Sequence, residues 1–184
     1  VIYADFFQKR HDIKFLSEQL YNFMLEQPNK TFIVPAYTDK YFYRKNKKNF
    51  FHKKKKSKNG YFANYLLTKK KISRSNHPTN SFIFLGKYAK KLASIKIGSD
   101  SPHKIFEYIG FDDLITFGVN WNGSNSFHVA EYLSGISKIN IARNLVGSYY
   151  KKKNRIEWYS LNHIHGCSSV HMKDFRTKYV LRKI

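Results

Sequence analysis

Apolar residues recur at helical spacing near the start of the chain. The positions on this face are Ile13, Leu16, Leu20, Phe23 and Met24. A spacing of three and four residues is typical of a helix that packs one face against a core. The pattern predicts an amphipathic helix over residues 12–27, capped by Asp12 and ended by Pro28.

Shorter apolar runs follow and have the length of strands. Phe82–Leu85 and Leu92–Ile97 predict two short strands, and residues 86–88 open the connection between them. Gly60 and residues 76–78 predict turns, because Gly, Asn and Pro interrupt regular structure.

The last third of the chain alternates strand and helix patterns. The predicted elements are a strand at Leu114–Trp121, a helix at Ser126–Lys138, strands at Ile141–Val146 and Ile156–Leu161 with a hairpin tip at 149–155, a helical turn at 168–175 and a strand at Tyr179–Ile184. Strands flanking a helix predict an α+β two-layer sandwich. The chain thereby divides into an amino-terminal extension (residues 1–110) and an α+β domain (residues 111–184).

The charge balance changes the interpretation of this pattern. The 184 residues include 34 Lys and Arg against 12 Asp and Glu, a net charge of +22 at pH 7. Such a charge favours a polyanionic partner, with nucleic acid first and an acidic membrane second. No apolar run approaches the ~18 residues that span a bilayer, and the single Cys167 excludes an internal disulfide framework. Abundant Lys, Asn, Ile, Tyr and Phe suggest an A/T-rich, often organellar, genome.

Cations interleaved with aromatic residues predict an RNA-binding surface, because ammonium groups neutralise phosphates and aromatic faces stack on bases. The candidates are Lys53, Lys54, Lys55, Lys56, Lys69, Lys70, Lys71 and Arg74 in the middle of the chain and Tyr149 and Tyr150 at the hairpin tip. The alternative interpretation of the middle segment is a solvated flexible loop.

One part of the carboxy-terminal pattern is similar to a known family. Residues 114–184 resemble small-subunit ribosomal protein ten in an organellar form, over the run Arg155–Ile164 and the pairs His163-Ile164 and Arg176-Thr177. The chain lacks that family's usual last helix and strand. The resemblance implies a ferredoxin-like α+β fold with a long basic hairpin and a basic amino-terminal extension.

The resemblance also implies a function. The protein would be a non-catalytic constituent of the mitochondrial small ribosomal subunit, in its head, encoded in the organelle and located in the matrix. Its partners would be ribosomal RNA and small-subunit proteins three, nine and fourteen, with no cofactor, membrane or small-molecule substrate. By position, the RNA-facing residues would be Lys151, Lys152, Lys153, Arg155, His163, Arg176 and Lys178.

Three alternatives stay open. The first is an RNA-binding accessory protein outside the ribosome. The second is a zinc-stabilised nucleic-acid-binding protein, whose ligands would be His163, His165, Cys167 and His171. The third is an enzyme, either a nuclease that holds Mg²⁺ on acidic residues or a cysteine nucleophile paired with a histidine. The acidic candidates are Asp100, Glu107, Asp112 and Asp113.

Overall fold

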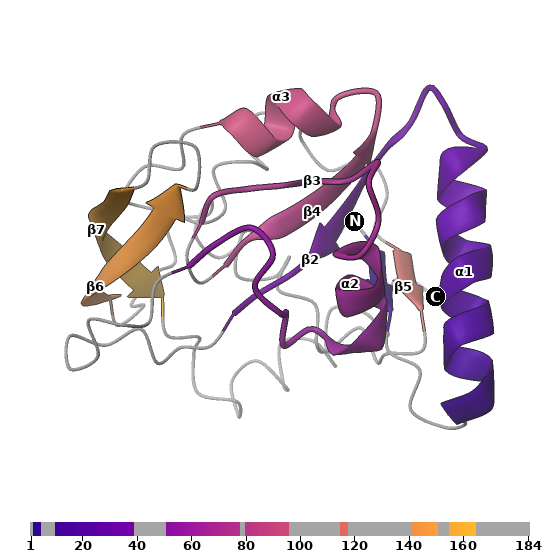
Figure 1. Ribbon diagram of the computed structural model, residues 1–184, viewed down its shortest axis with the longest axis horizontal. Helices are drawn as coiled ribbons and strands as arrows, with labels where there is room; N and C mark the ends of the chain where they lie inside the picture. Colours follow the sequence, from indigo (N-terminus) through magenta and orange to yellow (C-terminus); the bar gives the residue numbers. More distant parts are fainter. Residues whose placement is uncertain are drawn as a thin grey trace, which may run out of the picture.

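The computed structural model describes residues 2–4, 10–38, 51–77, 80–95, 115–117, 141–150 and 155–164. Its elements are β1 (Ile2–Ala4), α1 (Arg10–Leu25), β2 (Thr31–Pro35), α2 (Gly60–Leu66), β3 (Ser73–Arg74), β4 (Phe82–Gly86), α3 (Ala89–Ser94), β5 (Ile115–Phe117), β6 (Ile141–Tyr150) and β7 (Arg155–Ile164) (Figure 1). Within these ranges, no helix is long and apolar enough to cross a bilayer.

A three-stranded antiparallel sheet organises the first half of the chain. The strand order is β2–β4–β3, and Val34 of β2 pairs with Ile83 of β4. Successive side chains of a strand point to opposite faces. In β2 and β4 both sets are apolar and buried, so the sheet is covered on both faces.

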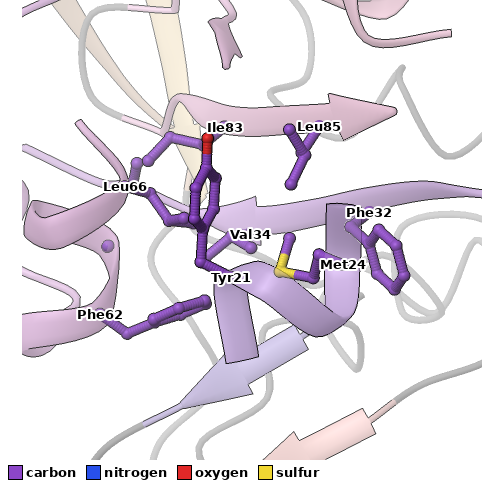
Figure 2. Close-up of a cluster of buried hydrophobic side chains, with 10 residues drawn as sticks. Tyr21, Met24, Phe32, Val34, Phe62, Leu66, Ile83 and Leu85 are labelled. Carbon is purple, nitrogen blue, oxygen red and sulfur yellow. The ribbon is translucent and has the colours of Figure 1, made fainter. Parts of the chain in front are cut away.

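Helices α1 and α2 cover one face of this sheet (Figures 1 and 2). The first core cluster comprises Tyr21, Met24, Phe32, Val34, Ala36, Phe62, Ala63, Leu66, Ile83 and Leu85. Burying this apolar surface removes it from water at about 25 cal/mol per Å². Packing of this cluster is therefore the main contribution that holds the two helices on the sheet.

The other face is covered by α3. Its buried residues Ala89, Leu92 and Ala93 pack against Ile33, Phe82 and Phe84, which make up the second core cluster. The predicted strand at Leu92–Ile97 is therefore wrong, because residues 89, 92 and 93 meet the sheet at helical spacing. The predicted strand at Phe82–Leu85 is confirmed as β4.

The turn between β4 and α3 requires glycine. Gly86 has a φ of +107°, and a Cβ there would lie 2.1 Å from the Lys30 carbonyl oxygen. The same carbonyl accepts a hydrogen bond from the Lys87 N–H at 3.2 Å. The predicted turn at residues 86–88 is thus confirmed, and it locks the end of β4 to the start of β2.

The first predicted helix is confirmed with shifted ends. α1 begins at Arg10, so Asp12 lies inside its first turn instead of capping it. An acidic residue there still favours the helix through the macrodipole. Gly60, predicted as a turn, has a positive φ of 77° and is the first residue of α2, a helix that the sequence analysis did not predict.

Two further strand pairs among the described residues include strands from the second half of the chain. β5 pairs in parallel with β1, and β6 pairs with β7 in an antiparallel hairpin from Ile141↔Ile164 to Tyr150↔Arg155. The predicted hairpin is confirmed, with longer strands than expected. The predicted helix at 126–138 and the last turn and strand lie outside the described residues. The division at residue 110 stays a prediction, although β1 and β5 pair across it.

Candidate functional site

Buried polar side chains gather at one end of the β2–β4–β3 sheet, here called the polar end. They are Thr38, Ser57, Arg74, Ser75, His77 and Ser81. β2 and β3 end here and β4 begins here, since Pro35 pairs with Phe82 and Arg74 with Ile83. Buried polar groups need hydrogen-bond partners, so this end of the sheet is built around directional contacts.

The side chain of Arg74 is the centre of the polar end, with an exposed fraction of 2%. Its Nε donates to Ser81 Oγ at 2.9 Å, and one terminal nitrogen donates to the Ala36 carbonyl at 2.6 Å. The other terminal nitrogen donates to the carbonyls of Lys53, at 3.1 Å, and Lys55. Every acceptor that the described residues give this guanidinium is neutral.

An aromatic ring completes the surroundings of Arg74. The guanidinium carbon lies 5.0 Å from the ring centroid of the fully buried Phe51, within the range of a cation–π contact. Burial lowers the pKa of Arg74 to about 10, which leaves the group charged at neutral pH. The buried charge is thus stabilised by carbonyl dipoles and a π face.

Residues 51–58, here called the basic loop, are fixed to the polar end. Besides the two carbonyls bound by Arg74, the Lys58 N–H donates to the Tyr37 carbonyl at 2.7 Å. Asn64 of α2 accepts from the Ser57 N–H at 2.8 Å and donates to the Ser57 carbonyl at 2.9 Å. A loop tied at both ends presents its lysines in a preorganised arrangement.

The lysines of the basic loop face solvent. Lys53, Lys54, Lys56 and Lys58 are exposed, and Lys55 is half-buried. Partial desolvation lowers the pKa of Lys53 and of Lys55 from their ordinary value. A compact set of ammonium groups on a fixed backbone is suited to an anionic ligand such as a phosphate.

Two of the histidines that the structure describes, His52 and His77, lie at the polar end. His52 is exposed, and desolvation, with smaller contributions from Lys55 and Arg74, lowers its pKa. His77 is buried, and its Nδ1 accepts a hydrogen bond from the Asn80 N–H at 2.8 Å. A neutral His77 with Nδ1 as acceptor carries its proton on Nε2. The hydrogen bond joins His77, which follows β3, to Asn80, which precedes β4.

The structure separates the residues that were predicted to bind RNA. Lys53, Lys54, Lys55 and Lys56 lie together on the basic loop, and Lys70 and Lys71 are exposed after α2. Lys69 instead covers the α1–α2 junction, with Nζ 4.1 Å from the ring centroid of Tyr65, whose side chain raises the pKa of Lys69. Arg74 is used inside the molecule, so its guanidinium does not reach an external phosphate.

The remaining candidates are on or beyond the β6–β7 hairpin. Tyr149, Tyr150, Arg155 and His163 lie in these two strands, where backbone pairs join Tyr150 to Arg155 and His163 to Ala142. Lys151, Lys152, Lys153, His165, Cys167, His171, Arg176 and Lys178 lie outside the described residues, as do the acidic candidates Asp100, Glu107, Asp112 and Asp113. No cluster of three potential metal ligands occurs among the described residues.

Comparison with known families decides the identity of the fold. A model of the family described as aminoglycoside 3-N-acetyltransferase matches residues 24–183, which is most of the chain. The chain belongs to this family. Its members are enzymes, so the prediction of a non-catalytic protein is wrong. No curated protein sequence matches the chain.

Solved structures of the aminoglycoside 3-N-acetyltransferase family share the fold. The YokD protein from Bacillus subtilis matches 99% of this chain and 80% of its own length, with a TM-score of 0.72 and 15% identity. AAC-IIIb, solved with CoA, matches 84% of this chain and 67% of its own, with a TM-score of 0.64 and 17% identity. A histidine-to-alanine mutant of AAC(3)-IVa, in complex with apramycin, matches 99% of this chain and 71% of its own length, with a TM-score of 0.66 and 14% identity.

These findings overturn the ribosomal interpretation. The chain is not a form of small-subunit ribosomal protein ten, and its fold is that of the acetyltransferases instead of a ferredoxin-like sandwich. The predicted partners are wrong as well. They were ribosomal RNA and small-subunit proteins three, nine and fourteen, with no small-molecule substrate, whereas structures of the family hold CoA or an aminoglycoside. The accessory RNA-binding and zinc alternatives fall as well. The mitochondrial location stays a prediction.

The sequence analysis missed most of the polar end. His77 was treated as part of a turn and Arg74 as an external contact, and Ser75 and Ser81 were given no functional role. A signal was nevertheless present, because a continuous polar run, Ser73–Ser81, ends directly against the apolar strand β4. Polar residues that flank buried strand ends frequently form sites.

Proposed function

We propose that this protein is an N-acetyltransferase that transfers the acetyl group of acetyl-CoA to an amino group on a sugar. The observation that carries the proposal is the family match over residues 24–183. The fold shared with AAC-IIIb, a protein solved with CoA, supports the acetyl donor. The fold shared with an AAC(3)-IVa mutant solved with apramycin supports an amino sugar as acceptor.

The reaction joins an amine nitrogen to the carbonyl carbon of a thioester. The N–C bond forms and the C–S bond breaks. The CoA thiolate takes up the proton that the nitrogen loses, so CoA leaves as its thiol. An amine is mostly protonated at pH 7, so the enzyme needs a group that accepts a proton before the attack. Histidine is the side chain most often used for this step, because its pKa lies near neutrality.

The described residues supply the frame of such a site. Arg74, Ser81 and the Ala36 carbonyl fix the ends of β2, β3 and β4 relative to one another. The exposed lysines of the basic loop fit a phosphate group, by charge and by their fixed backbone. Acetyl-CoA supplies the activated acetyl group, and the protein holds the acceptor amine against it.

The direct test is an acetylation assay with the purified chain. The protein is incubated with acetyl-CoA and, in separate reactions, glucosamine, glucosamine 1-phosphate, apramycin and gentamicin. We expect CoA release that depends on the acceptor, and an acceptor heavier by one acetyl group in mass spectrometry. Acceptor-independent CoA release at the same rate with every amine would mean hydrolysis and would contradict the proposal.

A histidine scan then identifies the proton acceptor. Each of the eight histidines is replaced by glutamine in turn, so that the silent variants are controls for the active one. We expect one replacement to lower kcat by about 10²–10⁴-fold while acetyl-CoA binding, followed by calorimetry, is retained. A uniform small effect at all eight positions would show that histidine is not the base.

A further inference from the structure

The positive charge of the chain is concentrated in one segment. Residues 40–99 contain 18 of the 34 Lys and Arg and none of the 12 Asp and Glu. The remaining residues hold 16 cations against 12 acids, which is close to balance. The charge is therefore a local property of the segment that contains the basic loop, α2, β3, β4 and α3.

The basic loop has the highest density of lysines in this segment, and the structure fixes its backbone to the polar end. The backbone of Lys53 and Lys55 is bound by Arg74, and Ser57 is bound by Asn64. The side chains of Lys54 and Lys56 are exposed on this fixed backbone. Like charges that lie close together repel one another and oppose folding, so an anion at the basic loop would offset this repulsion.

The chemistry of the acceptor follows from this charge. An aminoglycoside carries several ammonium groups, which are bound best by carboxylates, and residues 40–99 contain no carboxylate. CoA is an anion, but its phosphates carry only about four negative charges. These negative charges are fewer than the 18 cations of this segment, so the segment can hold a second anion beside acetyl-CoA.

We propose that the acceptor is an amino sugar that carries a phosphate or diphosphate, and that the basic loop binds this phosphate. The inference rests on the proposed function, and names its acceptor class. The phosphate takes no part in the transfer of the acetyl group. It anchors the sugar so that the amine, on another carbon, reaches the thioester. A sugar phosphate and a nucleoside diphosphate sugar share this chemistry.

The test compares acceptors that differ only in phosphate. Glucosamine, glucosamine 1-phosphate and its uridine diphosphate derivative are assayed with the full chain at low and at high salt, with apramycin as the polycation. We expect kcat/KM at low salt to be at least about tenfold higher for a phosphorylated acceptor than for glucosamine, and the ratio to shrink with salt. A higher value for the uridine diphosphate derivative assigns a nucleotide carrier, and an equal value assigns the phosphate alone.

A pair of double variants locates the effect. Lys54→Gln/Lys56→Gln removes two charges from the basic loop, and Lys90→Gln/Lys91→Gln removes two exposed charges from α3 as the matched control. We expect the loop variant to raise the KM of glucosamine 1-phosphate about tenfold or more, with little change for acetyl-CoA or glucosamine. The α3 variant is expected to change these values less than twofold.

The outcomes separate this inference from the proposed function. Equal kcat/KM for glucosamine and its phosphate, or a preference for apramycin, would overturn the acceptor class and leave the acetyltransferase intact. A higher KM for acetyl-CoA alone in the loop variant would assign the basic loop to CoA and overturn the inference. Calorimetry with CoA present measures sugar binding directly. Tighter binding of the phosphorylated sugar without any transfer would overturn only the proposed function.

Discussion

The body and the polar end of the β2–β4–β3 sheet are buried to a similar degree but are held by different forces. In the body, Met24, Phe62, Leu66 and Ile83 pack with exposed fractions of 2% or less, and their contacts are apolar (Figure 2). At the polar end, Arg74 is equally buried, but it makes four hydrogen bonds to carbonyls and a hydroxyl.

The difference predicts how each region responds to substitution. Apolar burial has no direction, so the body should tolerate a change of shape that conserves volume. Hydrogen bonds depend on distance and angle, so the polar end should tolerate few changes even where charge is conserved. The apolar body therefore contributes most to the free energy of unfolding, and the polar end fixes the geometry of the strand ends at the candidate site.

The largest loss of stability is expected from a substitution that leaves a cavity in the apolar body of the sheet. Phe62→Ala should lower the free energy of unfolding by about 3–5 kcal/mol, because it removes a ring that is 1% exposed and leaves a cavity. Urea denaturation measures the loss. Phe15→Ala, on the exposed side of α1 with an exposed fraction of 60%, is the control and should cost less than about 0.5 kcal/mol. Similar losses in both variants would refute the assignment of this core.

A conservative substitution at each region tests the contrast itself. Arg74→Lys keeps the charge but loses the planar fork, and should cost about 2–3 kcal/mol because buried carbonyls lose their donors. Leu66→Met, fully buried in the body, should cost less than about 1.5 kcal/mol. Urea denaturation of both variants gives the comparison. If Arg74→Lys were as mild as Leu66→Met, the polar end would be held by charge alone.

The body could be predicted from sequence because periodicity reports burial. The helix at Arg10–Leu25 and the strand at Phe82–Gly86 were found from apolar spacing. α3 was missed because a short apolar run fits either period, and the deciding residue, Ala89, lies before the run that was considered. α2 was missed because Gly60 suggested a turn and nothing local shows that it begins a helix.

The polar end could not be predicted because its partners are distant in sequence. Arg74 meets a carbonyl 38 residues earlier, at Ala36, and no local pattern encodes that contact. Arginine is usually exposed, so a surface role was the natural expectation. The family was missed for a related reason. The ribosomal resemblance rested on the run Arg155–Ile164 and on the pair Arg176-Thr177, whereas the family match extends over residues 24–183. The net charge led to nucleic acid as the predicted partner, which the family match contradicts.

A smaller loss is expected where the basic loop joins α2. Asn64→Ala should cost about 1–2 kcal/mol, since the Ser57 N–H and the Ser57 and Gly60 carbonyls lose a partner. The loss is read from the urea midpoint. Asn22→Ala, at an exposed position of α1, is the matched control and should stay within about 0.5 kcal/mol. An Asn64→Ala variant as stable as the control would mean that the loop is not tied to α2.

The smallest effect is a pH dependence at the polar end. The pKa of His52 lies below its ordinary value of 6.5, through desolvation first and then through Lys55 and Arg74. The unfolded chain therefore binds this proton more readily than the folded chain. Stability should be unaffected above pH 6.5 and should decline as the pH falls from there through the folded pKa. Urea midpoints at a series of pH values measure this slope.

His52→Gln isolates that slope from the titration of the other histidines. The variant keeps a polar side chain but carries no titratable proton, so the difference between wild type and variant contains only the contribution of His52. We expect the wild type to lose stability faster than the variant as the pH falls below 6.5. Parallel curves would contradict the lowered pKa of His52, and would mean that neither desolvation nor the charges of Lys55 and Arg74 act on this imidazole in the folded protein.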